Sequence, residues 1–214
     1  MTDWYSILFS GAGTAATTWA ISYFWARARF QRIRFMDRTQ VDQELGEVER
    51  RFDKAEQEVR ISGNDCAFVA QAESPKIEKL LSRRVRVRLL MVDPNSSVPE
   101  MLSKIDPRFP TPEAFVNSMK SVLNVLRDIK ARYPNHFDYR LLPILPAQGF
   151  FIVDPTSESG FLKVEIYTAK DWRPIDSRPH LYIQKKEKRW RSYFIHQWDN
   201  YWSIANEDAQ QARR

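Results

Sequence analysis

The chain has 214 residues, of which 43% are hydrophobic and 28% are charged, and its net charge is +6. This composition is ordinary for a globular protein and excludes a largely disordered chain. The single cysteine, Cys66, excludes an intramolecular disulfide. The length allows one compact domain with an anchor and a connector, but not two full domains.

The first element in chain order is an apolar N-terminal segment. Trp4 to Ala26 comprises 23 residues without a charge, and a helix of that length extends about 34 Å, enough to cross a hydrocarbon core of roughly 30 Å. Aromatic residues lie at both ends of the segment, as in the interfacial belts of membrane proteins. The sequence therefore predicts a transmembrane helix within residues 1–26. A buried core helix of a soluble protein is the alternative.

The basic residues directly after this segment predict its orientation. A membrane-proximal basic segment is formed by Arg27, Arg29, Arg32, Arg34 and Arg38. Arginines that flank a membrane helix stay on the cytoplasmic side. This pattern predicts a single-pass inner (plasma) membrane protein with its N-terminus outside and its domain in the cytoplasm.

Residues 27–58 are predicted to contain this basic juxtamembrane segment and an amphipathic connector helix. Apolar residues recur at alternating spacings of four and three, which is a heptad pattern. The seam of the pattern is Val41, Leu45, Val48, Phe52, Ala55 and Val59. A coiled coil is the preferred interpretation, and with it a homo-oligomer, a dimer or higher. A single helix packed on its own domain fits nearly as well, because the seam is shorter than three heptads.

Residues 59–206 have the pattern of an α/β domain with a mixed sheet flanked by helices. Strands are predicted at 59–62, 84–93, 137–143, 149–153, 160–168 and 181–184. Helices are predicted at 69–81, from Thr111 to Tyr133, and over the aromatic segment 193–202. Residues 207–214 are expected to form a flexible tail.

The order of these elements resembles a phospholipase D-like domain. The resemblance lies in the segment 61–63, a helix, the strand and turn at 84–94, a long helix, and Arg140 leading to 151–154. It implies a catalytic signature His-x-Lys-x4-Asp, in which the histidine attacks phosphorus, the lysine binds phosphate oxygens and the aspartate orients the site.

This chain departs from that signature at its reactive positions. Aligned through Asp154, the histidine position is Ala147 and the lysine position is Gly149. Neither residue can form a phosphohistidine or supply a cation. The resemblance therefore implies a phospholipase D-like fold with a degenerate signature, and we expect no catalytic residues and no enzymatic activity.

A ligand is expected at the strand ends of the sheet, where such folds place their crevices. The candidate ligand-binding residues are Ser62, Asn64, Asp93, Arg140, Gln148, Asp154 and Lys163. Arg140 and Lys163 suit a nucleotide or another phosphate-bearing ligand. No metal-ligand spacing or phosphate-binding loop is present, so no metal and no cofactor are expected.

The basic run from Lys185 to Arg191 contains a tryptophan and suits phosphates of a nucleic acid or a lipid headgroup. Such a run is more often a solvated helix start, so nucleic acid is not an expected partner. The membrane, a second copy of the chain and a protein partner are the expected ones.

These observations predict a non-catalytic, membrane-tethered cytoplasmic sensor or effector module that relays ligand or protein binding to the membrane helix. The resemblance adds bacterial defence or stress signalling, because degenerate domains of this kind serve as sensor modules there. Two alternatives remain: a membrane-associated phosphodiesterase or nuclease with a non-standard site, and a structural subunit of a membrane assembly.

Overall fold

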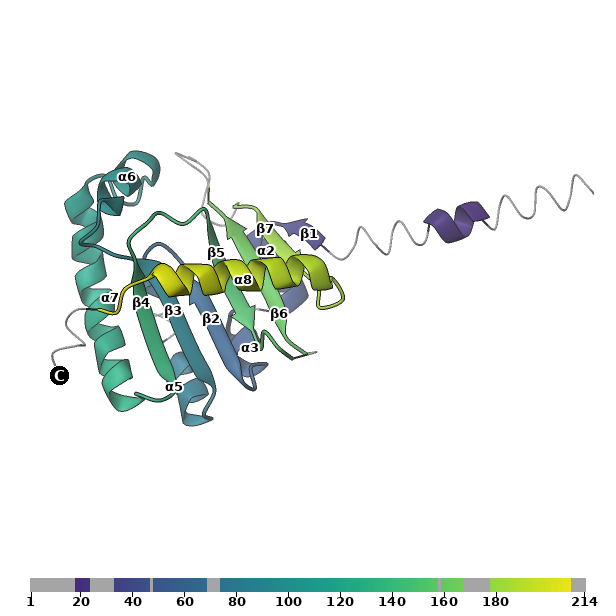
Figure 1. The fold of residues 1–214 in the computed structure, drawn as a ribbon, viewed down its shortest axis with the longest axis horizontal. Coiled ribbons are helices and arrows are strands. Elements are labelled where there is room, and N and C mark those ends of the chain that lie inside the picture. Colours follow the sequence, from purple (N-terminus) through teal and green to yellow (C-terminus); the bar gives the residue numbers. More distant parts are fainter. Residues whose placement is uncertain are drawn as a thin grey trace, which may run out of the picture.

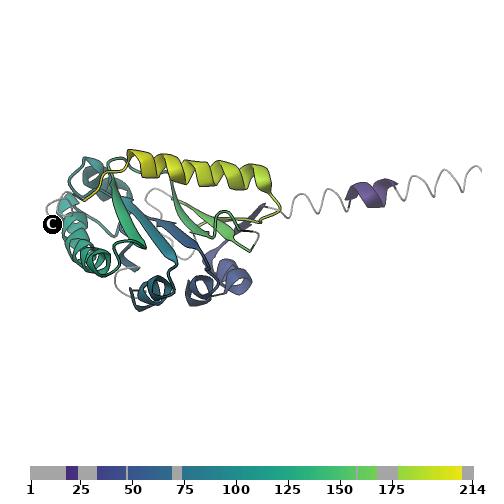
Figure 2. The same cartoon turned by 60° about the horizontal axis from the view of Figure 1, so that its bottom comes forward.

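A seven-stranded mixed sheet with helices on both faces forms the centre of the protein (Figures 1 and 2). The computed structural model describes residues 18–23, 33–46, 48–68, 74–157, 159–167 and 178–208. The strands are β1 (Ile33–Met36), β2 (Glu58–Ser62), β3 (Arg86–Val92), β4 (Phe137–Leu142), β5 (Gln148–Val153), β6 (Phe161–Ile166) and β7 (His180–Ile183). The helices are α2 (Arg38–Leu45), α3 (Val48–Asp53), α5 (Ser74–Ser82), α6 (Val98–Ile105), α7 (Pro112–Arg132) and α8 (Lys188–Ile204).

The strand order is β1-β7-β6-β5-β2-β3-β4. Strands β2, β3 and β4 run parallel, whereas β5 pairs antiparallel with β2 and the strands from β5 to β1 continue antiparallel. The position of β3 inside the sheet, between β2 and β4, explains its sequence. Its last four residues, Leu89 to Val92, are all buried because helices cover both faces there.

Two hydrophobic layers pack against the sheet. Helix α8 lies alone on one face in Figure 2, and its fully buried Trp198 anchors the smaller layer. Helices α3, α5 and α7 contribute to the larger layer on the other face, through residues such as Phe52, Ile77 and Phe115. One face of the sheet between α2 and α3 and the strands β6 and β7 remains hollow, and it holds the site described below.

The longest helix, α7, shows why these elements form where the sequence predicts them. The side chain of Thr111 accepts a hydrogen bond from the backbone N–H of Ala114 at 3.2 Å, and Pro112 occupies the first helical position. Both features favour a helix start. The helix ends at Tyr133, directly before Pro134. All six strands predicted within residues 59–206 are present, with bounds shifted by at most two residues, and the mixed α/β sheet is confirmed.

The prediction of an N-terminal transmembrane helix is wrong. Among the residues that the structure describes, no helix is long and apolar enough to cross a membrane. Only residues 18–23 of that segment are described, as a short helix, and the rest of 1–26 lies outside the described residues, as do Arg27, Arg29 and Arg32. The localisation as a single-pass membrane protein was derived from that helix and is corrected with it.

The connector helix is also absent in its predicted form. Residues 33–36 form the edge strand β1, and the chain turns at Gly46 between α2 and α3 instead of continuing as one helix. Two of the arginines assigned to the membrane face, Arg34 and Arg38, contact residues of the domain instead. Arg34 pairs with Glu44 and its guanidinium lies 5.4 Å from the centre of the Tyr182 ring.

The described residues of the heptad seam pack in the hydrophobic core of their own domain. Its members Val41, Phe52, Ala55 and Val59 are each at most 2% exposed and belong to the larger hydrophobic layer. The side chains of Leu45 and Val48 lie outside the described part of the chain. Homo-oligomerisation therefore stays a prediction without the support of this seam.

The folded unit is longer than the expected 59–206. It begins at β1, and at the other end Asp208, which was placed in the flexible tail, is buried. The carboxylate of Asp208 accepts hydrogen bonds from Arg127 at 2.7 Å and from the Tyr139 hydroxyl at 2.9 Å. Residues 209–214 lie outside the described residues.

Candidate ligand-binding site

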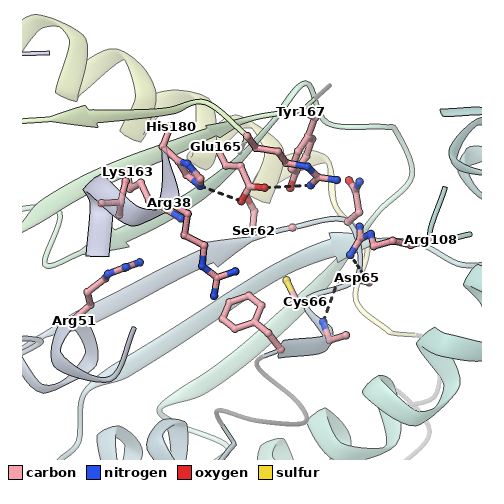
Figure 3. A pocket seen from close by; sticks show the side chains of 16 residues that line it. Arg38, Arg51, Ser62, Asp65, Cys66, Arg108, Lys163, Glu165, Tyr167 and His180 are labelled. Atoms are coloured by element: carbon pink, nitrogen blue, oxygen red, sulfur yellow. Dashed lines mark hydrogen bonds and ion pairs between the residues drawn. The ribbon is translucent and has the colours of Figure 1, made fainter. Parts of the chain in front are cut away.

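A cavity of about 390 Å³ lies at the carboxyl end of β2, between the sheet and the helices α2 and α3 (Figure 3). Small-molecule sites in proteins typically have about 300–1,000 Å³. Its walls come from segments far apart in sequence: α2, α3, the loop after β2, the loop between α6 and α7, and the strands β6 and β7.

The floor of the cavity is built by β6 and its neighbours. Lys163, Glu165 and Tyr167 point to one side of the sheet, because residues two apart along a strand share a face. Glu165 lies in register with Gly149 of β5 on one side and with His180 of β7 on the other. This face therefore carries a row of polar groups in an otherwise apolar layer.

The loop after β2 forms one wall. The hydroxyl of Ser62 accepts a hydrogen bond from the N–H of Phe150 at 3.0 Å, and the carbonyl of Asn64 accepts one from the N–H of Val92 at 3.0 Å. These bonds hold the loop against β3 and β5. Cys66 follows in the same wall, and its burial raises the pKa of the thiol, which therefore stays protonated.

Two arginines from α2 and α3 form the opposite wall. Asp37 caps α2 by accepting a hydrogen bond from the N–H of Gln40 at 2.8 Å. Arg38, the next residue and the first of α2, lines the cavity, with its Nε 3.8 Å from Oδ2 of Asp42. Arg51 is almost fully buried and contacts the same carboxylate. One carboxylate thus faces two guanidinium groups.

Lys163 lies near these arginines and has no counter-ion of its own. Within the described part of the chain, its ammonium group forms no ion pair and no hydrogen bond. Desolvation lowers its pKa to about 8, although Glu165 raises it in part, and Arg51 and Arg38 lower it further. At neutral pH the cavity therefore holds an enclosed cation that an anionic ligand would stabilise.

His180 is neutral at physiological pH. Burial and, to a lesser extent, the charge of Lys163 lower its pKa to about 4. Its Nε2 lies 3.9 Å from Oε2 of Glu165. Because the imidazole is uncharged, this contact is not an ion pair, and His180 offers ring nitrogens for hydrogen bonding but no positive charge.

The far end of the cavity is balanced in charge. Arg108 binds Asp106 at 2.7 Å and Asp65 at 3.2 Å, and Arg178 binds Glu165 at 3.2 Å. Although desolvation opposes the shift, the hydrogen bond from Arg108 lowers the pKa of Asp106, which keeps that carboxylate ionised. The two arginines at this end are therefore already neutralised by carboxylates.

Two buried polar atoms at the cavity have no hydrogen-bond partner among the described residues. They are Oδ1 of Asn64, a residue that is 8% exposed, and Nδ1 of His180, a residue that is 4% exposed. Unpaired buried polar atoms cost about 1–3 kcal/mol each, so native proteins rarely keep them without a partner such as water or a ligand.

The lysine position of the phospholipase D signature is filled by a neighbouring side chain. A Cβ atom at Gly149 would lie 2.6 Å from the hydroxyl oxygen of Tyr167 and 3.0 Å from the carbonyl oxygen of Ser62. No side chain fits there without moving Tyr167. The histidine position, Ala147, is exposed.

The structure brings together three of the seven candidate ligand-binding residues. Ser62, Asn64 and Lys163 line the cavity. Asp93 lies in the turn after β3, where its carboxylate accepts a hydrogen bond from the N–H of Asn95 at 2.9 Å. Gln148 begins β5 and does not line the cavity.

Asp154 lies at the amino end of β2, away from the cavity, and fixes the backbone at the start of that strand. It is fully buried, and its carboxylate accepts hydrogen bonds from the backbone N–H groups of Glu56, Gln57 and Glu58 at 2.8–2.9 Å. Its φ of 44° is in the left-handed region. Asp154, the residue that matches the aspartate of the signature, therefore has a clear structural role in this chain.

Arg140 faces the α8 layer, on the opposite side of the sheet from the cavity. It donates a hydrogen bond to the carbonyl of Trp202 at 3.0 Å, and its guanidinium lies 4.7 Å from the centre of that indole ring. It belongs to a set of arginines on β2, β3 and β4 that pack on the tryptophans of α8. Arg140 thus binds α8 in this structure.

Sequence reasoning missed most of the charged lining. The residues it did not select as ligand-binding are Arg38, Arg51, Asp65, Arg108, Tyr167, Arg178 and His180. One signal was available: the alternation of Lys163, Glu165 and Tyr167 along a predicted strand places all three on one face. No group of three or more histidine, cysteine or carboxylate residues suited to a metal occurs in the described ranges.

Comparisons with known proteins give similarity in fold only. No protein-family model and no curated protein matches the chain. Phosphatidylserine synthase of Haemophilus influenzae Rd KW20 is similar in structure, with 15% identity, a TM-score of 0.55, and coverage of 82% of this chain and 39% of that chain. This likeness shows a shared fold and no shared activity. Nuc from Salmonella typhimurium, a phospholipase D family member, also aligns, with 15% identity, a TM-score of 0.43, and coverage of 73% and 85%.

A third similar structure is TrmBL2, an archaeal chromatin protein described as showing a novel mode of DNA binding. It is 14% identical with a TM-score of 0.50, covering 95% of this chain and 67% of that chain. At this identity the similarity shows a likeness of fold and assigns no partner to this chain. The expectation that nucleic acid is not a partner stays a prediction.

Proposed function

We propose that this chain is a non-enzymatic binding module that takes up a small phosphate-bearing ligand in the basic cavity and acts as a sensor for it. The observation that carries the proposal is Lys163, an enclosed ammonium group without a counter-ion, which lies close to Arg38 and Arg51. Phosphate oxygens supply the missing negative charge and accept several hydrogen bonds at once.

The balance of charge at this end of the cavity supports an anion. Lys163, Arg38 and Arg51 lie together near the carboxylate of Asp42, and the charges of both arginines lower the pKa of Lys163. Like charges held together in an enclosed site repel one another, and a bound anion converts that repulsion into attraction. The volume of about 390 Å³ is far larger than one water molecule, whose share of the liquid is about 30 Å³.

The emptied signature supports a role in binding without turnover. Ala147 offers no nucleophile, and the contact between Gly149 and Tyr167 leaves no room for the lysine. His180 is held by its surroundings and carries no charge at neutral pH. Cys66 keeps its thiol protonated, so it is a poor nucleophile.

The proposal is tested by calorimetric titration of the full chain with inorganic phosphate at pH 7.5. We expect saturable binding that Lys163→Met weakens by roughly tenfold or more, because charge-assisted hydrogen bonds contribute about 1.5–3 kcal/mol. Lys163→Arg, which keeps the charge, should retain binding. Lys120→Met removes a lysine from the exposed face of α7 and is the matched control.

Two results would contradict the proposal. The first is the same phosphate affinity in Lys163→Met as in the unaltered chain. The second is robust hydrolysis of bis(p-nitrophenyl) phosphate by the purified chain at a rate that depends on cavity residues, because this would restore the phosphodiesterase alternative.

A further inference from the structure

The cavity has two ends with different chemistry. Lys163, Arg38 and Arg51 gather at one end, whereas Glu165, Asp65 and Tyr167 lie toward the other in Figure 3. Arg108 and Arg178 at the second end are already paired with carboxylates, whereas Lys163 at the first end has no ion pair among the described residues. The first end therefore suits one phosphate group, whereas a second phosphate group at the other end would be repelled by the carboxylates of Glu165 and Asp65.

The second end is suited to hydroxyl groups. Glu165 is an acceptor, the unpaired Oδ1 of Asn64 is a buried acceptor, and the hydroxyl of Tyr167 can donate or accept. A ligand hydroxyl donates one hydrogen bond and accepts others, so it can satisfy groups of both kinds. Bare inorganic phosphate at Lys163 would leave Asn64 unsatisfied.

The spacing of the two ends is that of one sugar ring. Lys163 and Glu165 are two residues apart on β6, which separates their Cα atoms by about 7 Å. A further step along the same face leads to Tyr167. Phe68 also lines the cavity and offers an aromatic face against which the apolar face of a sugar ring can pack.

From these observations we infer that the ligand is a phosphate monoester of a sugar, with its phosphate at Lys163 and its hydroxyls at Asn64 and Glu165. This inference rests on the proposed function, because it assigns the body of the ligand whose phosphate the basic end binds. A free sugar phosphate and the ribose phosphate of a nucleotide share this chemistry, and titration separates the two sources.

The experiment compares inorganic phosphate, glucose 6-phosphate, AMP and glucose as ligands of the full chain and of Asn64→Ala. We expect at least one of the two sugar phosphates to bind tenfold or more tightly than inorganic phosphate, and glucose to bind far more weakly. The tighter of the two identifies the source. In Asn64→Ala this advantage over inorganic phosphate should fall by roughly 2–10-fold, as for one lost hydrogen bond.

Asn64→Ala should fold normally, because the Asn64 side chain makes no hydrogen bond among the described residues and only its carbonyl binds Val92. If inorganic phosphate binds but neither sugar phosphate binds more tightly, the inference is overturned and the proposed function stands. An unchanged advantage in Asn64→Ala also overturns it. If inorganic phosphate does not bind at all, the proposed function itself fails.

Discussion

The close approach of Tyr167 to Gly149 predicts a specific coupling between the two positions. In Gly149→Ala the new methyl carbon would lie 2.6 Å from the Tyr167 hydroxyl oxygen and 3.0 Å from the Ser62 carbonyl oxygen. Overpacking of this kind costs about 1–3 kcal/mol. Replacing glycine by alanine recovers about 0.4–1 kcal/mol from the unfolded chain. We expect a net loss of about 1–2 kcal/mol in the free energy of unfolding.

Most of that loss should disappear when the hydroxyl is removed. Tyr167→Phe alone should cost little, because the hydroxyl makes no hydrogen bond within the described residues. Gly149→Ala with Tyr167→Phe should then be nearly as stable as Tyr167→Phe alone, which gives a coupling energy of about 1 kcal/mol, within the range for residues in contact. Urea denaturation of the four proteins measures it.

Gly63→Ala is the matched control on the same cavity. Its added methyl carbon would lie 3.3 Å from the sulfur of Cys66 and 3.8 Å from the Tyr167 hydroxyl oxygen. It should therefore cost less than Gly149→Ala and should not respond to Tyr167→Phe. Strictly additive effects of Gly149→Ala and Tyr167→Phe would refute the conclusion that Tyr167 fills the lysine position.

Two further predictions concern the charged groups. Phosphate affinity should fall as the pH rises through about 8, because Lys163, whose pKa in the free protein is about 8, loses its proton. Calorimetry of Lys163→Arg should show no such fall. The pKa of Lys163 is lower in the folded protein than in the unfolded chain, so the unfolded state binds more protons above pH 8. The contribution of Lys163 to the free energy of unfolding therefore rises with pH from 8 to 10.5. A rise just as large in Lys163→Met would show that Lys163 is not its source. Asp154→Asn should lower the free energy of unfolding by about 3 kcal/mol, because a charged acceptor of three backbone N–H groups is lost. The control Asp128→Asn, at an exposed position, should cost under about 1 kcal/mol. The phosphate affinity of folded Asp154→Asn should be unchanged, and a selective loss of binding would place Asp154 in the site.

Local patterns in the sequence were sufficient for most of the fold. The run of buried residues in β3 and the cap and apolar face of α7 determine their own structure, because a central strand and a covered helix each leave a periodic signature. The same patterns misled in the first quarter of the chain. Apolar residues spaced alternately four and three apart occur both in coiled-coil seams and in short helices that pack on a sheet. Val41 and Phe52 belong to short helices of the second kind and are buried in the core.

The site depends on pairings that no local pattern contains. Lys163 was selected for its charge, but its meeting with Arg38 and Arg51 requires that α2 and α3 lie over β6. That placement follows from β1 joining the sheet beside β7, between residues almost 150 positions apart. Arg38 was instead explained by a membrane surface, since exposed arginines after an apolar segment satisfy a simpler rule.

The position of Lys163 shows what the proposed phosphate site requires of the sheet. Gly149 of β5 is the position that the resemblance to phospholipase D aligns with a lysine, and it lies on the face of the sheet that forms the cavity floor. Lys163 lies on the neighbouring strand β6 on that same face, opposite Phe151 and two residues from the pairing partner of Gly149. Tyr167 fills the space beside Gly149. The proposed binding needs only a cation near the phosphate, whereas phosphoryl transfer also needs a nucleophile at a fixed angle. Lys163 can meet the first requirement, and Ala147, which the resemblance aligns with the histidine, cannot meet the second.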